Sequence, residues 1–292
     1  MGKSKITLIG LGQMGAALVY PYLDAGQDVT VWNRTAQRAE PLVAKGAKLV
    51  ESLEDAIISS DLIIVCLADY GIAGDLLHRA GIEALLAGKT LVHLTTGNGA
   101  QAEDWATWAK QKGIDYLDGA IMDYPTKIGH PECLLLISGE QSVYETYATQ
   151  LTLLGRMTFV GAHIANANHL DGALLTMYYG NTFSLMQSLA MLMGGGVDIE
   201  TLREPLEAFK PVIDSTWKRT LDHVLSGDYS GNEASINVHL LGIESLMKRA
   251  ESAGVEHKLL SLFNDYIEKT EALGFRDDEL PAVFELFRPK KA

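Results

Sequence analysis

One acidic side chain stands inside a long apolar stretch in the second half of the chain. Asp171 is the only Asp, Glu, Lys or Arg between positions 163 and 193. Apolar surroundings raise the pKa of a carboxyl group, so Asp171 is a candidate proton donor or acceptor near neutral pH. The alternative is a structural role, in which Asp171 pairs with a buried Asn or with a helix end.

Tyr179 is a second candidate, because it follows Asp171 by eight residues. In a helix this spacing advances about 80° beyond two full turns, so both side chains lie on roughly one side. The alternative for Tyr179 is packing in a core or an interface. No lysine occurs between Lys127 and Lys210, which excludes oxidation of a hydroxy acid by a lysine on this helix.

The stretch from about 163 to 193 is predicted to form one long helix. It contains no proline and is apolar nearly all round. A surface helix would have a polar face, so we expect this one to be buried on most sides, between domains or between subunits. Polar residues interrupt the stretch and no positive charges flank it, which argues against a membrane span.

The start of the chain carries a glycine pattern typical of dinucleotide binding. Gly10, Gly12 and Gly15 follow a β-prone run, open a helical pattern and precede a second β-prone run at 28–32. This strand, glycine turn and helix let backbone N–H groups approach a pyrophosphate. A glycine-rich turn without a ligand is the alternative. The predicted contacts in this turn are Gly10, Leu11, Gly12, Gln13, Met14 and Gly15.

The segment after the second strand favours NADP(H) over NAD(H). An NAD site usually has an acid there, whereas an NADP site supplies positive charge for the 2′-phosphate. No acid occurs between Trp32 and Arg38. The predicted contacts are Asn33, Arg34, Thr35 and Arg38. Solvated surface positions are the alternative for the two arginines.

Strands and helices alternate up to Gly161, and only helices are expected afterwards. The alternation predicts a doubly wound parallel sheet, a Rossmann domain at 1–161, followed by a helical domain at 162–292 that includes the long helix. Single helices are expected at 72–86, 199–209 and 211–225. Ligands bind beyond the carboxyl ends of such strands. The loops there supply Leu67, Ala68 and Thr96 for the cofactor, and Met122 and Tyr124 for the substrate.

Composition narrows the choice of partners. The net charge of -13 argues against nucleic acid. No signal peptide and no membrane-spanning run are evident, so a cytoplasmic protein is expected. The two cysteines have no metal-ligand spacing, and no metal site is expected.

A small helical domain beside a very apolar helix would leave much surface uncovered, which favours a homodimer that shares the helix.

Four motifs resemble those of the imine reductases and their reductive aminase relatives. They are IGLGQMG at 9–15, VWNRT at 31–35, GAIMDYPTKIG at 119–129 and DGALLTMYYG at 171–180. The resemblance implies reduction of C=N bonds by NADPH, with a small imine, or a carbonyl compound plus an amine, as substrate. It also implies a domain-swapped homodimer whose active site lies between one subunit's Rossmann domain and the other's helical domain.

The resemblance also assigns roles to individual residues. Asp171 matches the position at which related dehydrogenases carry a catalytic lysine, and Tyr179 matches a tyrosine of the reductive aminases. A carboxyl group there can protonate an imine or stabilise an iminium ion. Thr96 stands where reductive aminases carry Asn, and His239 where the substrate pocket carries Gln. Imine reduction is therefore expected. The Thr96 difference argues against the joining of free amines to ketones, so only some reductive amination is expected beside it.

Two other functions fit parts of the sequence. An NADP-dependent β-hydroxyacid dehydrogenase would share the fold, but the missing lysine and the absence of a Ser-Gly-Gly loop near Tyr124 argue against it. A non-catalytic NADP(H)-binding protein would need only the first domain's features. Asp171 and Tyr179 on one apolar helix are hard to explain in such a protein.

Overall fold

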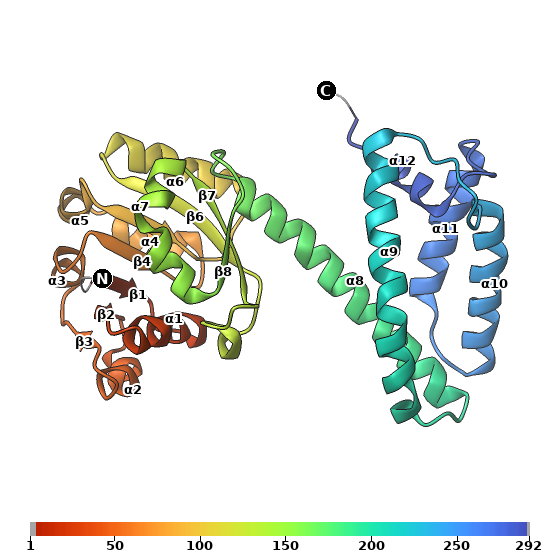
Figure 1. Ribbon diagram of the computed structural model, residues 1–292, viewed down its shortest axis with the longest axis horizontal. Coiled ribbons are helices and arrows are strands. Elements are labelled where there is room, and N and C mark those ends of the chain that lie inside the picture. The colour runs from red at the N-terminus through yellow and green to blue at the C-terminus, as the bar shows by residue number, and fades with distance from the viewer. Residues whose placement is uncertain (1–3, 291–292) are drawn as a thin grey trace. The chain divides into compact units, whose positions relative to one another are not determined.

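The computed structural model describes residues 4–290, which form two compact units. The first ends at Met177 and the second begins at Tyr178, so the division falls inside the long helix. The expected domain boundary at 161/162 stays a prediction. The first unit consists of β1 (Lys5–Ile9), α1 (Gln13–Asp24), β2 (Asp28–Trp32), α2 (Glu40–Val43), β3 (Lys48–Leu49), α3 (Leu53–Ile58), β4 (Leu62–Val65), α4 (Tyr70–Leu77), α5 (Ala80–Leu86), β5 (Thr90–His93), α6 (Gly99–Gln111), β6 (Asp115–Ile121), β7 (Leu134–Gly139), α7 (Gln141–Leu151), β8 (Arg156–Phe159) and the start of α8 (Asn166–Gly194) (Figure 1).

One sheet with the strand order β3-β2-β1-β4-β5-β6-β7-β8 organises the first unit. The predicted doubly wound sheet is confirmed, with one correction. All neighbouring strands are parallel except β6 and β7, which are antiparallel. The physical reason is the connection between them: it contains only a short 3-10 turn, Pro125–Lys127, and a parallel pair would need a longer crossover, usually a helix.

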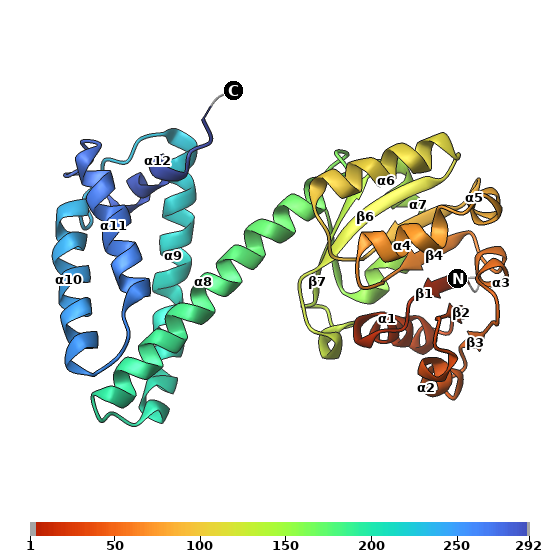
Figure 2. The ribbon, with the colours of Figure 1, turned by 180° about the vertical axis from the view of Figure 1, so that it is seen from behind.

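Alternating side chains of the buried strands build two cores, one on each face of the sheet. Leu62 and Ile64 of β4 point to the face covered by α1 and α7. Ile63 and Val65 point to the opposite face, covered by α3, α4, α5 and α6 (Figures 1 and 2). The sheet is therefore covered on both sides, and its ligand-accessible region is the carboxyl edge of the strands.

The second unit is entirely helical, as predicted. A core of Ile236, Ile243, Ala250, Leu260 and Ile267 joins its helices at 236–252 and 258–272. The seven-residue spacing within each helix places these side chains on one face. In the described part of the chain, no helix is long and apolar enough to cross a membrane. The unit contains the second half of α8, α9 (Arg203–Ser226), α10 (Ile236–Ser252), α11 (Lys258–Ala272) and α12 (Phe284–Phe287).

Two helix predictions are wrong. The expected helix at 72–86 is two helices, because Arg79 adopts an extended conformation between α4 and α5. The expected pair at 199–209 and 211–225 is mainly one helix, α9, which continues through Pro211. Proline there leaves the carbonyl of Glu207 without its helical donor. Both residues are exposed, so water can satisfy this carbonyl.

The long helix is largely uncovered in the single chain, so its burial between domains or between subunits stays a prediction. Only Ala167, Asn168 and Asp171 of α8 are buried. Tyr179, Phe183 and Met186 are 55%, 58% and 56% exposed. More than half of each side chain is therefore exposed in the described chain, although apolar surface of this kind is normally buried.

Candidate functional site

A cavity of about 430 Å³ opens beyond the carboxyl ends of β1, β2 and β4. Its floor is the turn from Gly10 to Gly15. A Cβ on Gly10 would lie 2.2 Å from the carbonyl oxygen of Cys66, and one on Gly15 would lie 2.1 Å from that of Gly10. Gly10 also has a φ of 98°, which favours glycine. The turn can therefore take this tight path only with glycine at both positions.

Helix α1 begins at this turn and is suited to bind an anion. Its N-cap residue is Gly12, and no side chain caps its free N–H groups. These groups and the positive end of the helix dipole face the cavity mouth, where a phosphate would be stabilised.

The end of β2 is fastened to the glycine turn. The Oδ1 atom of Asn33 accepts a hydrogen bond of 2.9 Å from the backbone N–H of Leu11. Its Nδ2 atom donates to the carbonyl of Thr35 at 2.9 Å. Arg34 and Arg38 follow on this loop and are exposed. The structure gives no ion pair to either arginine within residues 4–290, so both can approach a 2′-phosphate.

The structure brings together all predicted cofactor residues except one. Thr96 lies on the loop after β5, is exposed, and does not line the cavity. The role of the other residues toward the cofactor stays a prediction. Sequence reasoning missed five lining residues, of which three belong to α4. The Asp69 cap, which accepts from the N–H of Ile72 at 2.7 Å, was the available signal for that helix start. The five are Trp32, Cys66, Ile72, Asp75 and Leu76.

Gly12 offers a direct test of this cavity. A Cβ on Gly12 would meet no protein atom within 4 Å, and its φ of -65° suits alanine. We expect Gly12→Ala to keep the thermal stability of the protein and to weaken NADPH binding at least about tenfold. Gly15→Ala should lose both stability and binding, because its Cβ would collide with the backbone. Fluorescence titration and thermal unfolding measure the two effects, and normal NADPH affinity in Gly12→Ala would contradict the assignment.

Asp171 lies in the first turns of α8 and is 8% exposed. Burial raises the pKa of its carboxyl above the usual 3.8. No hydrogen bond to this carboxyl is found among residues 4–290, in contrast to the other buried acids of the chain. A buried carboxyl group without a partner is suited to interact with a substrate.

The other predicted residues are divided between the two units. Met122 and Tyr124 lie on the loop after β6, in the first unit, and Tyr124 is exposed. Tyr179 and His239 belong to the second unit. Burial lowers the pKa of His239, which lines two cavities beside Leu280 and Phe287. Neither unit alone contains the complete predicted site.

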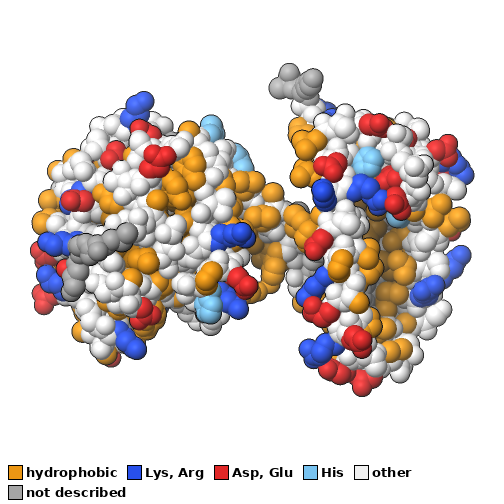
Figure 3. Space-filling model, viewed as in Figure 1, with side chains coloured by type: hydrophobic (Ala, Val, Ile, Leu, Met, Phe, Trp, Pro, Cys, Tyr) orange, Lys and Arg blue, Asp and Glu red, His pale blue; other side chains and the backbone are white. Residues whose placement is uncertain are grey.

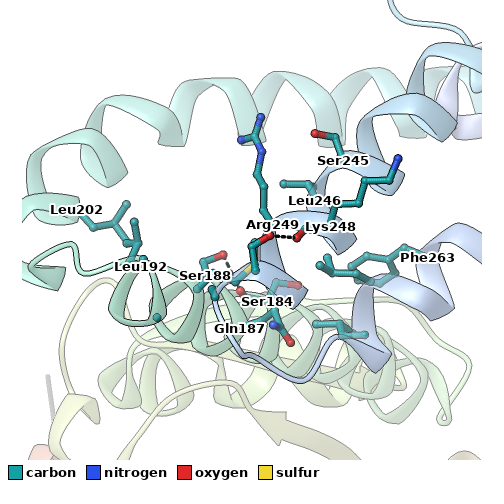
Figure 4. Close-up of a pocket in the computed structure, with 17 residues that line it drawn as sticks. Ser184, Gln187, Ser188, Leu192, Leu202, Ser245, Leu246, Lys248, Arg249 and Phe263 are labelled. Carbon is teal, nitrogen blue, oxygen red and sulfur yellow. Dashed lines mark hydrogen bonds between the residues drawn. The ribbon is translucent and has the colours of Figure 1, made fainter.

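Another cavity, of about 720 Å³, lies within the helical unit between α8, α10 and α11 (Figure 4). Ser184, Gln187 and Ser188 of α8 face Leu246 and Arg249 of α10 across it. Its lining includes no Asp, Glu, His, Cys or Tyr. Lys248 and Arg249 are the only charged side chains in this lining, so it offers no carboxyl or imidazole group for proton transfer.

Two family models match this chain. Residues 5–162 match the model of the NAD binding domain of 6-phosphogluconate dehydrogenase. Residues 164–289 match the C-terminal domain of NADPH-dependent reductive aminase-like proteins. The NADPH-dependent reductive aminase of Aspergillus oryzae is 32% identical over 295 residues, which cover 98% of each chain.

Solved structures show the same likeness. The imine reductase from Myxococcus stipitatus in complex with NADP+ has a TM-score of 0.91 and 33% identity, covering 97% of this chain and 100% of that one. A reductive aminase from Aspergillus terreus, in complex with NADPH4, cyclohexanone and allyl amine, has a TM-score of 0.90 and 30% identity, covering 98% and 100%.

This chain belongs to the imine reductase and reductive aminase family. It is an NADP(H)-dependent oxidoreductase that acts on C=N bonds, and the predicted family, cofactor and reaction class are confirmed. The glycine turn, the uncapped start of α1 and the two arginines fit NADP(H). The dehydrogenase alternative is less favoured.

Proposed function

We propose that this protein reduces small imines with NADPH and that Asp171 is its proton donor. The observation that carries the proposal is the buried Asp171 carboxyl, which has a raised pKa and no hydrogen-bond partner among the described residues. It lies on a helix without lysine. A cation at this position would repel an iminium ion, whereas a carboxyl group stabilises it.

NADPH, when bound, supplies the hydride that the carbon of the C=N bond receives. Asp171 gives its proton to the imine nitrogen, which makes the carbon a far better hydride acceptor. The resulting carboxylate then stabilises the positive charge on nitrogen until the charge is neutralised. The buried surroundings of Asp171 strengthen this attraction, because they exclude water.

Isotope transfer tests this reaction. When NADPH deuterated at C4 of the nicotinamide is incubated with a 2-substituted pyrroline, the amine product should carry one deuterium at the former C=N carbon. Mass spectrometry of the product measures this. Incorporation from deuterated solvent instead would contradict hydride transfer from the cofactor.

The pH dependence of the rate identifies the state in which Asp171 acts. Because burial raises its pKa above 3.8, Asp171 keeps its proton to higher pH than an exposed carboxyl. With a neutral imine, kcat/KM should fall as pH rises through this raised pKa. With an N-alkylated iminium salt, which needs no proton, the fall should disappear or reverse. Identical profiles for the two substrates would contradict proton donation by Asp171.

We further propose that the site is completed in a homodimer that shares α8 by domain swapping. The support is the exposed apolar surface on α8, above all Tyr179 and Phe183. The helical unit also has a largely hydrophobic hollow, lined in part by Ile243, Leu246 and Phe263, that suits such a helix (Figure 3). Light scattering should give twice the mass of one chain, and a monomer that retains full activity would contradict the shared site.

Met122 and Tyr124, together with His239, are proposed to line the substrate pocket, with Tyr179 hydrogen-bonding near the imine nitrogen. The Aspergillus terreus relative was solved with cyclohexanone and allyl amine, so a carbonyl compound plus an amine is a plausible second substrate class. We expect reductive amination to be slower than reduction of a preformed cyclic imine. NADPH oxidation with cyclohexanone plus allyl amine, compared with a pyrroline, measures this order.

A further inference from the structure

A fully buried acid lies beneath the loops at the carboxyl edge of the sheet. Asp118 of β6 is 0% exposed. Its Oδ2 atom accepts hydrogen bonds from the hydroxyls of Tyr70, at 2.6 Å, and Tyr116, at 2.5 Å. Its Oδ1 atom accepts one of 2.6 Å from the Nδ2 of Asn168. Burial raises the pKa of Asp118 to about 6, although the three donors oppose this rise.

Two of these donors connect Asp118 with the functional regions of the first unit. Tyr70 is the first residue of α4 and follows Ala68, which lines the cofactor cavity, by two positions. Asn168 precedes Asp171 by three positions on α8, and both are buried. Residues with this spacing lie on one face of a helix. The Asp118 carboxyl thus joins the cofactor side of the sheet to the helix turn that carries the proposed acid.

We propose that Asp118 is a positioning residue that, through Asn168 and Tyr70, holds Asp171 in line with the bound cofactor. The inference rests on the proposed function and adds a residue that contacts neither reactant. Hydride transfer is sensitive to such positioning, because a displacement of about 1 Å can cost about 100-fold in rate.

The loop after β5 supports the same arrangement. A Cβ on Gly97 would lie 2.2 Å from the ring of Tyr70, and one on Gly99 would lie 2.7 Å from the ring of His169. The loop is therefore packed against both Tyr70 and the first turn of α8. Two other hydrogen bonds join this turn to the edge of the sheet at β7 and β8. Asn166 donates to the carbonyl of Val160, and the backbone N–H of Ala167 donates to the hydroxyl of Ser138.

Tyr116 provides a matched control for a merely structural role. It donates to the same oxygen of Asp118 as Tyr70 and is equally buried. It lies on β6 with Asp118, and in the described chain its hydroxyl forms no hydrogen bond with residues 66–69 or with α8. Its hydroxyl also lies 3.1 Å from Nδ1 of His93, so Tyr116→Phe removes at least as many contacts as Tyr70→Phe.

The experiment compares Asn168→Ala, Tyr70→Phe and Tyr116→Phe in the full-length protein. Stopped flow with NADPH and a cyclic imine gives the rate of hydride transfer, and titration gives the NADPH dissociation constant. We expect Asn168→Ala to slow hydride transfer about 100-fold and Tyr70→Phe about tenfold. Tyr116→Phe should stay within about threefold of the unmodified protein despite a similar loss of thermal stability. NADPH affinity should change little in Asn168→Ala.

Exchanging the acid and the amide tests whether the rate of hydride transfer can be restored. In the double variant Asp118→Asn/Asn168→Asp, the new amide accepts from both tyrosines and donates to the new carboxylate, so the link between β6 and α8 is restored in reverse. Its hydride-transfer rate should exceed that of Asn168→Asp alone at least tenfold. Equal losses in Tyr116→Phe and Asn168→Ala, or absence of rescue, would overturn the positioning role while leaving imine reduction intact. An unmodified protein that reduces no imine would overturn both proposals.

Discussion

Asp171→Asn should lower kcat for a neutral imine about 1,000-fold, within the range that a general acid contributes. Asparagine has nearly the same shape but cannot supply the proton or become the anion that stabilises the iminium ion. The dissociation constant of NADPH should change less than about threefold, because Asp171 does not line the cofactor cavity. Steady-state kinetics and fluorescence titration separate these two effects.

The matched control is Asp104→Asn, which removes an exposed acid from α6 of the same unit. It should leave both the turnover and the NADPH affinity unchanged. Equal losses of turnover and affinity in Asp171→Asn would assign Asp171 a structural role. Unchanged turnover would remove it from the mechanism altogether.

The double variant Arg34→Ala/Arg38→Ala should weaken NADPH binding about 100-fold or more and NADH binding by less than about threefold. A hydrogen bond to a charged group contributes about 1.5–3 kcal/mol, and two guanidinium groups contact the same phosphate in this account. NADH lacks the 2′-phosphate, so it loses nothing when they are removed. Titration of both cofactors at low and high salt measures the change.

The dependence of NADPH affinity on salt concentration provides a second measurement. In the unmodified protein NADPH affinity should fall with rising ionic strength, because the arginines are exposed, and the double variant should show a weaker dependence. Lys45→Ala is the control, since it removes an exposed cation from the region after α2. A double variant that still prefers NADPH over NADH would show that another part of the cavity recognises the phosphate.

The sequence was sufficient to predict the glycine turn and the buried strands that support it. Gly10, Gly12 and Gly15 are local signals, because a tight turn and a close backbone approach require glycine regardless of the rest of the fold. The apolar run of β4 likewise predicts a buried strand by itself. These features depend on neighbours in the chain, and the structure agrees with them.

The rest depends on contacts between distant parts of the chain or between chains. Tyr70, Asp118 and Asn168 are far apart in the sequence, so no pattern indicates that their side chains meet. Asp118, an acid in the middle of the apolar strand β6, was the one available sign of such a contact. The burial of α8 could not be judged either, because an apolar helix surface does not indicate which part of a protein covers it. Thr96 was placed by its position after the fifth strand and by resemblance, and its loop instead packs beside Tyr70.

The most direct test of the central claim is the oxidation of NADPH, followed at the nicotinamide absorbance, with a 2-substituted pyrroline as substrate. NADH serves as the cofactor control and a 3-hydroxy acid with NADP+ as the substrate control. We predict rapid consumption of NADPH, little consumption of NADH and no reduction of NADP+ by the hydroxy acid. Reduction of NADP+ by the hydroxy acid, with no consumption of NADPH by the imine, would contradict the account and indicate a dehydrogenase that works without the lysine.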